Sequence, residues 1–266
     1  MILTSENYFS QEASREYISV SQYKDFIGSL GRPSCEETAL AKLNGEWEMV
    51  KSSALLVGSY VDSHFEGTLA MFKAQNPEIF TKGGDLKAEY RRANDIINRI
   101  ERDQMFMNYM SGDKQTILTA EMFGTKWKIK MDSYIKGKAI VDLKIMKSVN
   151  EQFYIKDYGL RVNFIDNWGY DIQGAVYQEV VYRVTGKRLP FFIAAASKEP
   201  YSNIELIQVE QEKLNERLSE VEQNTPKILM LKSGETEPLR CETCDHCKHT
   251  KVLTKPIWSS ELLGDL

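Results

Sequence analysis

The chain has 266 residues, of which 42% are hydrophobic, so it can bury one substantial core, and we expect one elaborated domain rather than two. No run of 18 apolar residues occurs, which excludes a membrane-spanning helix, and the polar, glutamate-bearing N-terminus is unlike a signal peptide. The expected location is therefore a bacterial cytoplasm. The net charge of −4 and the isoelectric point near 5.6 argue against a uniformly basic DNA-binding protein, although local basic surfaces remain compatible with them.

Four helices are predicted in the first 110 residues. Ser19 is a good N-cap for the first of them, and Gly31-Arg32-Pro33 ends it. His64 lies on the third helix, which can lean over the strands that follow. A long amphipathic helix comes after chain breaks at Asn76-Pro77 and Gly83-Gly84. The predicted ranges are 19–30, 35–43, 53–72 and about 85–110.

Residues 126–147 have a regular two-residue periodicity. Apolar and polar side chains alternate on both sides of Gly137, which indicates a β-hairpin with a turn at Lys136-Gly137-Lys138. In a hairpin that is symmetric about Gly137, position 132 pairs with 142 and position 130 with 144. Asp132, Asp142 and Lys144 then project from one face, where directly opposed Cβ atoms lie about 5 Å apart.

Two carboxylates at that distance repel each other, and this repulsion raises the pKa of one of them. A divalent cation removes the conflict, and oxygen ligands select hard ions such as Mg²⁺ or Mn²⁺, which bind phosphate esters and lower the pKa of a bound water. Lys144, on the same face, can steer that water. The alternative for a D-x-K pair taken alone is a cross-strand salt bridge on a solvated hairpin.

Further strands and helices surround the hairpin. Glu121, on a strand that precedes it, is a weaker candidate for an additional carboxylate. A long loop over residues 148–165 carries aromatic and basic side chains that suit the end of a DNA duplex. The next helix places Gln173 and Tyr177, at i and i+4, on one face. Strands over 116–123, 189–196 and 203–209 and helices over 167–185 and 210–231 complete an order that fits a mixed sheet flanked by helices.

The motifs together resemble the PD-(D/E)xK nuclease superfamily, in which a metal-binding acid on one strand precedes a D/E-x-K on the next. Asp132 and Asp142-Leu143-Lys144 match that pattern. Gly58-Ser59-Tyr60-Val61-Asp62-Ser63-His64 resembles the G-x-x-x-H-type helix of the branch shared by the RecB nuclease domain, Cas4 and the RecE-type phage recombination exonucleases. Residues 170–177 resemble the Q-x-x-x-Y helix of that branch, and residues 19–253 as a whole are most similar to the RecE-type group.

The resemblance implies an α/β fold with a mixed central β-sheet flanked by helices, that is, a restriction-endonuclease-like core with an N-terminal helical elaboration. We expect the helical part over about 19–110, the catalytic core over about 115–231 and a cysteine-containing tail over 232–266, all within a single nuclease domain of residues 1–266.

The resemblance also implies roles for the site residues. His64, Asp132, Asp142 and the Leu143 carbonyl are expected to hold Mg²⁺ or Mn²⁺, Lys144 to position or help to deprotonate the attacking water, and Gln173 and Tyr177 to line the site and hold the catalytic groups or the DNA backbone.

The activity implied by the resemblance is that of an exonuclease. RecE-type enzymes digest one strand of linear double-stranded DNA from the 5′ end and leave single-stranded 3′ tails. They act as ring-shaped homo-oligomers such as tetramers, and they work with a single-strand annealing protein of the RecT type in phage or prophage recombination. A local excess of nine Lys or Arg over four Asp or Glu between residues 126 and 161 suits contact with a phosphate backbone.

The cysteines form a separate motif, because Cys241, Cys244 and Cys247 follow a C-x-x-C-x-x-C spacing and Cys35 lies far upstream. In a chain without a secretion signal this favours metal binding over disulfides. One cysteine before the nuclease core and three after it resembles the layout of the iron-sulfur relatives, Cas4 and the AddB-type nucleases, although the last gap is shorter here. The residues leave open a [4Fe-4S] cluster, zinc with help from His246 or His249, and ordinary reduced thiols.

Two other functions remain open at this stage. One is a Cas4-like iron-sulfur nuclease that trims DNA ends, and it predicts the same acidic pocket. The other is a non-catalytic DNA-binding module with a structural metal. The intact set of Asp132, Asp142 and Lys144 argues against the second, because a binding module has no use for a catalytic lysine.

Overall fold

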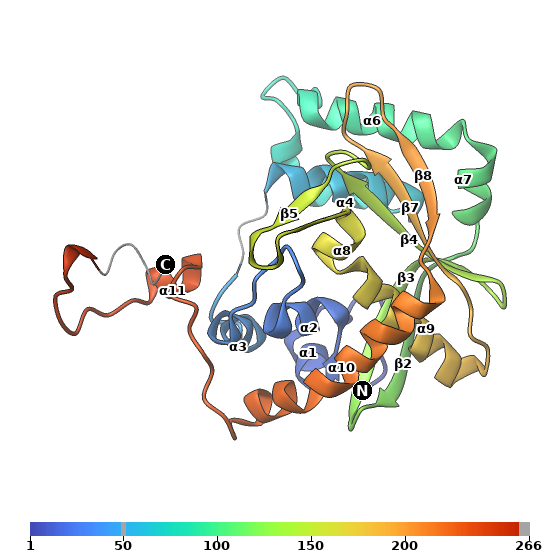
Figure 1. Ribbon diagram of the computed structural model, residues 1–266. Coiled ribbons are helices and arrows are strands. Elements are labelled where there is room, and N and C mark those ends of the chain that lie inside the picture. The colour runs from blue at the N-terminus through green and yellow to red at the C-terminus, as the bar shows by residue number, and fades with distance from the viewer. Residues whose placement is uncertain (49–51, 261–266) are drawn as a thin grey trace.

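A computed structural model of the chain describes residues 1–48 and 52–260 (Figure 1). Within these residues, six strands form one mixed sheet: β1 (Tyr17–Ile18), β2 (Asp113–Met122), β3 (Thr125–Ile135), β4 (Ala139–Met146), β7 (Phe191–Ser197) and β8 (Ile204–Gln208). The strand order is β1-β3-β4-β7-β8, with β2 paired to β3. The β1–β3 and β4–β7 pairs are parallel, and the β2–β3, β3–β4 and β7–β8 pairs are antiparallel.

Helices cover both faces of this sheet (Figure 1). One core contains Trp127 and Phe191 and is closed by α2 (Val20–Ile27), α9 (Tyr170–Thr185) and α10 (Gln211–Ser233). A second core contains Val141 and Leu143 and is closed by α4 (Ser53–Phe65), α6 (Ala88–Glu101) and α7 (Gln104–Tyr109). The predicted fold class, a mixed central sheet flanked by helices, is therefore confirmed.

Short elements connect these layers. They are α1 (Gln11–Glu16), α3 (Glu36–Asn44), α5 (Leu69–Gln75), η1 (Pro77–Ile79), β5 (Phe153–Ile155), η2 (Lys156–Tyr158), β6 (Leu160–Val162), α8 (Phe164–Trp168) and α11 (Asp245–His249). After α11 the described chain extends away from the body of the molecule, and residues 261–266 of the predicted tail lie outside the described range (Figure 1). No helix in the described part of the chain is both long enough and apolar enough to cross a membrane.

Several predicted helices end earlier than their apolar spacing indicated. The helix predicted over 53–72 is two helices, α4 and α5, because Gly67 between them has a φ of +78°, which only glycine adopts readily. The helix predicted over 85–110 divides into α6 and α7, because Asp103 caps a new helix and its Oδ1 accepts from the Phe106 amide at 2.9 Å. The loop predicted over 148–165 contains an antiparallel hairpin of β5 and β6.

The β3–β4 hairpin positions the functional residues. Its ladder pairs Ser133 with Val141, Tyr134 with Ile140 and Ile135 with Ala139, which is the predicted register about Gly137. The predicted pairs 132–142 and 130–144 are not part of that ladder. Beyond Val141 the two strands diverge, while β4 continues beside β7 as far as Met146. The backbone edge that β4 presents toward β3 is thus left open beside Asp132.

Candidate metal-binding active site

Asp132 fills the position where the β3–β4 ladder stops. Its Oδ2 accepts a hydrogen bond from the Leu143 amide at 2.8 Å, so a side chain replaces the missing backbone partner. Its Oδ1 accepts a longer bond, 3.4 Å, from the Gln115 amide group of β2. The carboxylate of Asp132 is therefore fixed against the backbone of the D-x-K segment.

Asp142 is almost completely buried on β4, with 2% of its surface exposed. Its Oδ1 accepts a hydrogen bond from Gln173 Nε2 at 2.6 Å. Its Oδ2 forms an ion pair with the Lys144 ammonium. The same ammonium lies 4.9 Å from the centre of the Tyr170 ring, which holds the lysine between a carboxylate and an aromatic face.

Gln173 and Tyr177 lie one turn apart on α9 and both face the diverging strands. While Gln173 holds Asp142, the Tyr177 hydroxyl donates to the Lys130 carbonyl of β3 at 3.0 Å. Burial raises the pKa of Tyr177 well above its usual range, so the hydroxyl keeps the proton that it donates. The structure thus brings both residues to the candidate site: Gln173 contacts Asp142, and Tyr177 contacts β3, the strand that carries Asp132.

Helix α4 contributes an acid that the sequence analysis did not select. Asp62 faces Asp132 and Asp142 closely enough for their charges to raise its pKa, and its Oδ1 is buried without a hydrogen-bond partner in the described residues. A hollow of about 410 Å³ is lined by Asp62, Glu66, Gln115, Lys130 and Asp132 among others. Asp62 of α4, the C-cap residue Glu66 and Asp132 of β3 therefore line a single cavity.

The structure corrects the predicted role of His64. Its Nε2 is 2.7 Å from Glu101 Oε1 at the end of α6, so the ring pairs with Glu101 and not with Asp132 or Asp142. At about 100° per residue, His64 points roughly 200° around the helix from Asp62. The G-x-x-x-H motif places its ligand four positions after the glycine, and the fourth residue after Gly58 is Asp62. Counting from the glycine was the signal that could have identified this acid.

Glu121 does not join the site. Its side chain is exposed, and it pairs across β2 and β3 with Lys126, six positions along β3 from Asp132. The position of Glu121 therefore does not support a role for β2 as the source of a further carboxylate for the metal site.

Burial and charge repulsion govern protonation in the pocket. Burial, with the Asp142 charge as a second cause, raises the pKa of Asp132 to about 7. Burial followed by the charge of Asp132 raises the pKa of Asp62 well above its usual range. Burial by itself lowers the pKa of Lys144, but Asp142, Tyr170 and Asp132 outweigh it and raise the pKa overall. Lys144 is therefore protonated at neutral pH, whereas burial and mutual repulsion favour the neutral forms of Asp62 and Asp132, which a bound cation would allow to ionise.

The donor set fits a hard divalent cation. In the part of the chain that the structure describes, Asp62 Oδ1 is a buried carboxylate oxygen without a hydrogen bond, and Asp142 Oδ2 has the Lys144 ammonium as its charged partner. Leaving a buried carboxylate oxygen such as Asp62 Oδ1 unsatisfied is costly, and a cluster of carboxylate oxygens suits Mg²⁺ or Mn²⁺. Asp62, Asp132 and Asp142 are thus the residues placed to hold the ion.

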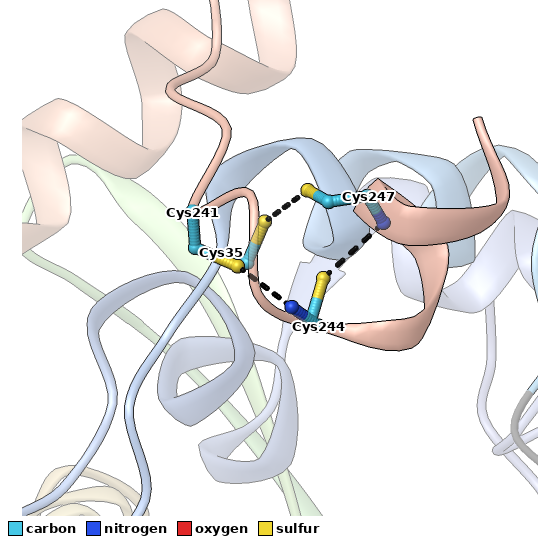
Figure 2. A group of neighbouring side chains, drawn as sticks. All are labelled: Cys35, Cys241, Cys244 and Cys247. Atoms are coloured by element: carbon cyan, nitrogen blue, oxygen red, sulfur yellow. Dashed lines mark hydrogen bonds between the residues drawn. The ribbon is translucent and has the colours of Figure 1, made fainter. Parts of the chain in front are cut away.

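The four cysteines meet at a second centre (Figure 2). The Sγ atoms of Cys35, Cys241, Cys244 and Cys247 lie within 4.8 Å of one another, and all four cysteines are free. Cys35 comes from the start of α3, and the other three come from the tail around α11. His246 and His249 are outside the cluster, with their rings 5.2 Å and 5.7 Å from the ring of Trp47.

The chain is similar to a protein-family model and to solved structures. The family model described as "PDDEXK-like domain of unknown function (DUF3799)" matches residues 19–250. A crystal structure from Eubacterium rectale that bears the name "Putative exonuclease" is 58% identical, covers 100% of both chains and has a TM-score of 0.97. The structure of SSO0001 matches with 13% identity over 71% of this chain and 85% of that chain, and its TM-score of 0.27 supports no conclusion. A search of the curated proteins gave no match.

Proposed function

We propose that this chain, which belongs to the PDDEXK-like family (DUF3799) within the PD-(D/E)xK nucleases, is a metal-dependent exonuclease that resects linear double-stranded DNA from 5′ to 3′. The family assignment follows from the match over residues 19–250 and from the relative that is 58% identical along the whole chain. The observation that carries the proposal is the convergence of Asp62, Asp132, Asp142 and Lys144 where β3 and β4 diverge.

The proposed chemistry is hydrolysis of a phosphodiester bond. When bound, Mg²⁺ or Mn²⁺ supplies a water of lowered pKa and offsets charge on the phosphate. Asp62, Asp132 and Asp142 would hold the ion, and the Leu143 carbonyl would offer a further oxygen. Gln173 fixes the orientation of Asp142 through its 2.6 Å hydrogen bond, so that carboxylate does not have to reorganise during the reaction.

Lys144 acts as a cation rather than as a base. A base must be neutral, whereas the neighbouring acids keep the Lys144 ammonium protonated. The ammonium therefore donates a hydrogen bond to the attacking water and offsets the negative charge that develops on the phosphate. The face of the Tyr170 ring and the Asp142 carboxylate hold it in place for both tasks.

Several groups near the pocket suit a DNA strand. Lys130 lines the same hollow as Asp62 and Asp132, where it can meet a phosphate. The β5–β6 hairpin exposes Tyr154 and Tyr158, whose rings can stack on bases that have left the duplex. These aromatic groups border a separate hollow of about 920 Å³ on the side of α2, which offers room for a displaced strand.

The finer points of the proposal rest on the resemblance to RecE-type enzymes. They are digestion from the 5′ end, release of single-stranded 3′ tails for phage-type recombination, assembly into a ring-shaped homo-oligomer such as a tetramer, and cooperation with a single-strand annealing protein of the RecT type in a bacterial cytoplasm. The preference for ends is also supported by the name of the Eubacterium rectale relative. Light scattering during size-exclusion chromatography tests the assembly, and a monomeric mass would contradict it.

The direct test of polarity uses linear duplex labelled at either the 5′ or the 3′ end, incubated with the protein and Mg²⁺. We expect early release of the 5′ label as short products while the 3′ label stays on long single strands. The matched control is Asp132→Asn, which keeps the size of the side chain and removes the charge. Early release of the 3′ label would overturn the polarity, and equal cleavage by Asp132→Asn would overturn the assignment of the pocket.

A further inference from the structure

The cysteine centre lies outside the hydrolytic pocket, and the proposed hydrolysis does not use it. Its sulfur atoms come from two segments far apart in the sequence, the start of α3 and the tail (Figure 2). Cys35 and Cys247 are 212 positions apart, yet their Sγ atoms are 3.5 Å apart. That distance is well beyond a disulfide bond of about 2.05 Å. From the spacing of these four sulfurs we infer that the chain binds one tetrahedral zinc ion, which cross-links the tail to the N-terminal helices.

The size of the centre distinguishes a single ion from an iron-sulfur cluster. Zinc bonded to four thiolates at about 2.3 Å in a tetrahedron holds neighbouring sulfurs roughly 3.8 Å apart. The four Sγ atoms here all lie within 4.8 Å of one another. A cluster ligated by four cysteines contains several irons bridged by sulfide, so its cysteine sulfurs stand farther apart than sulfurs around one ion. The iron-sulfur cluster implied by the layout of the relatives therefore does not fit these cysteines.

Hydrogen-bond donors are directed at the sulfurs. The Cys244 amide donates to Cys241 Sγ at 3.3 Å, and the Cys247 amide donates to Cys244 Sγ at 3.4 Å (Figure 2). Glu242, inside the first C-x-x-C turn, adopts a left-handed conformation with φ of +58°. The Thr38 hydroxyl lies 3.0 Å from Cys244 Sγ. Such donors stabilise thiolates and orient them as ligands, as outer contacts do at metal sites.

Charge at the centre is also accommodated. Binding of Zn²⁺ to four thiols releases their protons to solvent and leaves a net charge of −2, because each ligand must be a thiolate. Arg240 precedes Cys241, and its Nη2 donates to the Cys247 carbonyl at 2.9 Å, which places a cation beside the sulfurs. Cys247 is fully buried, so the ion would be shielded from solvent on that side.

Other contacts also hold the described part of the tail against α3, among them an ion pair between Arg240 and Glu37. The Leu239 amide donates to Glu36 Oε2 at 2.9 Å, the Glu37 amide donates to the Leu239 carbonyl at 3.3 Å, and Trp47 packs on two histidines of the tail. An ion shared by Cys35 and the tail closes a loop of more than 200 residues, which reduces the entropy of the unfolded chain. The zinc is therefore expected to stabilise the fold without taking part in hydrolysis.

The test is metal analysis of the full-length protein, purified anaerobically with reductant and dialysed without chelator. We expect about one zinc per chain and neither iron nor acid-labile sulfide. Because the acidic pocket could also take up zinc, Asp132→Asn is the matched control and should retain the zinc. Cys244→Ser should lose it, and its melting temperature should fall by about 5–10 °C.

Cobalt gives a second readout that identifies the ligands. Protein loaded with Co²⁺ should show sulfur-to-cobalt charge-transfer bands and the intense visible bands of a tetrahedral site, in the wild type and in Asp132→Asn but not in Cys244→Ser. If Cys244→Ser fails to fold, the spectrum of the cobalt-loaded wild type still shows whether thiolates bind the metal. Iron with matching sulfide, a cobalt spectrum without thiolate bands, or a wild type that still contains no zinc after incubation with Zn²⁺ and melts at the same temperature as Cys244→Ser would each overturn the zinc site.

Discussion

Asp62 and His64 are two residues apart on α4 but face different surroundings. Asp62 faces the acids of the pocket, whereas His64 pairs with Glu101 near the surface. We predict that Asp62→Asn lowers the rate of hydrolysis by at least about 100-fold and weakens Mg²⁺ binding, because even contacts to metal ligands are worth about 10–100-fold. His64→Gln should keep near wild-type activity and change the free energy of unfolding by less than about 1 kcal/mol, since a surface pair contributes little.

Initial rates on linear duplex and calorimetric titration with Mg²⁺ measure both variants side by side. The reverse pattern, with His64→Gln inactive and Asp62→Asn active, would restore the histidine as the ligand and remove Asp62 from the site.

Asp132 makes the stability of the metal-free protein depend on pH. Its pKa is about 7 in the fold and about 3.9 in an unfolded chain, so between these values the folded state holds a proton that the unfolded state releases. The free energy of unfolding therefore decreases as pH rises from about 4 to 7, and excess Mg²⁺ should restore it at pH 7.5. The same protonation should lower Mg²⁺-dependent hydrolysis as pH falls below about 7.

Thermal melts in Mg²⁺-free buffer across this range measure the effect. Asp132→Asn cannot exchange the proton, so its melting temperature should depend less on pH than that of the wild type. An identical pH dependence in both proteins would show that Asp132 does not carry the raised pKa.

At the scale of elements, α9 must lie close to the sheet for Gln173 to reach Asp142 on β4. Gly174 permits this approach, because a Cβ there would lie 2.5 Å from Phe191 Cδ1 and 2.9 Å from Leu214 Cδ2. Gly174→Ala should destabilise the protein by about 1–3 kcal/mol, as overpacking of a core does, and should also lower activity. Gly58→Ala on α4 is the matched control, since a Cβ there meets no atom within 4 Å and alanine favours a helix.

Urea denaturation of the two alanine variants compares their free energies of unfolding. If Gly174→Ala were as stable as Gly58→Ala, the close contact between α9 and the sheet would not be a constraint.

Local signals explain which elements the sequence could predict. Ser19 caps α2, with its hydroxyl accepting from the Gln22 amide, and Gly137 sets the hairpin register, so both features were predictable. The breaks at Gly67 and Asp103 were missed because the apolar spacing continues across them. The β5–β6 hairpin was missed because each strand has three residues, too few for an alternating pattern to show.

At the scale of the whole molecule, the site depends on contacts that no local pattern contains. Asp132, Asp142, Lys144, Gln173 and Tyr177 were identified from spacing and resemblance, and the fold brings them together. The divergence of β3 and β4 was not predictable, because it depends on the pairing of β4 with β7, which lies some 50 residues later. The meeting of Cys35 with the tail is equally non-local, and only the resemblance to relatives pointed to it.

The central claim is that this pocket performs end-dependent, metal-dependent hydrolysis of DNA. The most direct measurement is nucleotide release with Mg²⁺ from a linear duplex and from a covalently closed circle, using the wild type and Lys144→Ala in parallel. We predict that the wild type degrades the linear DNA and spares the circle, and that Lys144→Ala is slower by roughly 100–1000-fold while it still binds Mg²⁺ and DNA. Near wild-type digestion by Lys144→Ala, or cleavage of the circle as the main activity, would contradict this account.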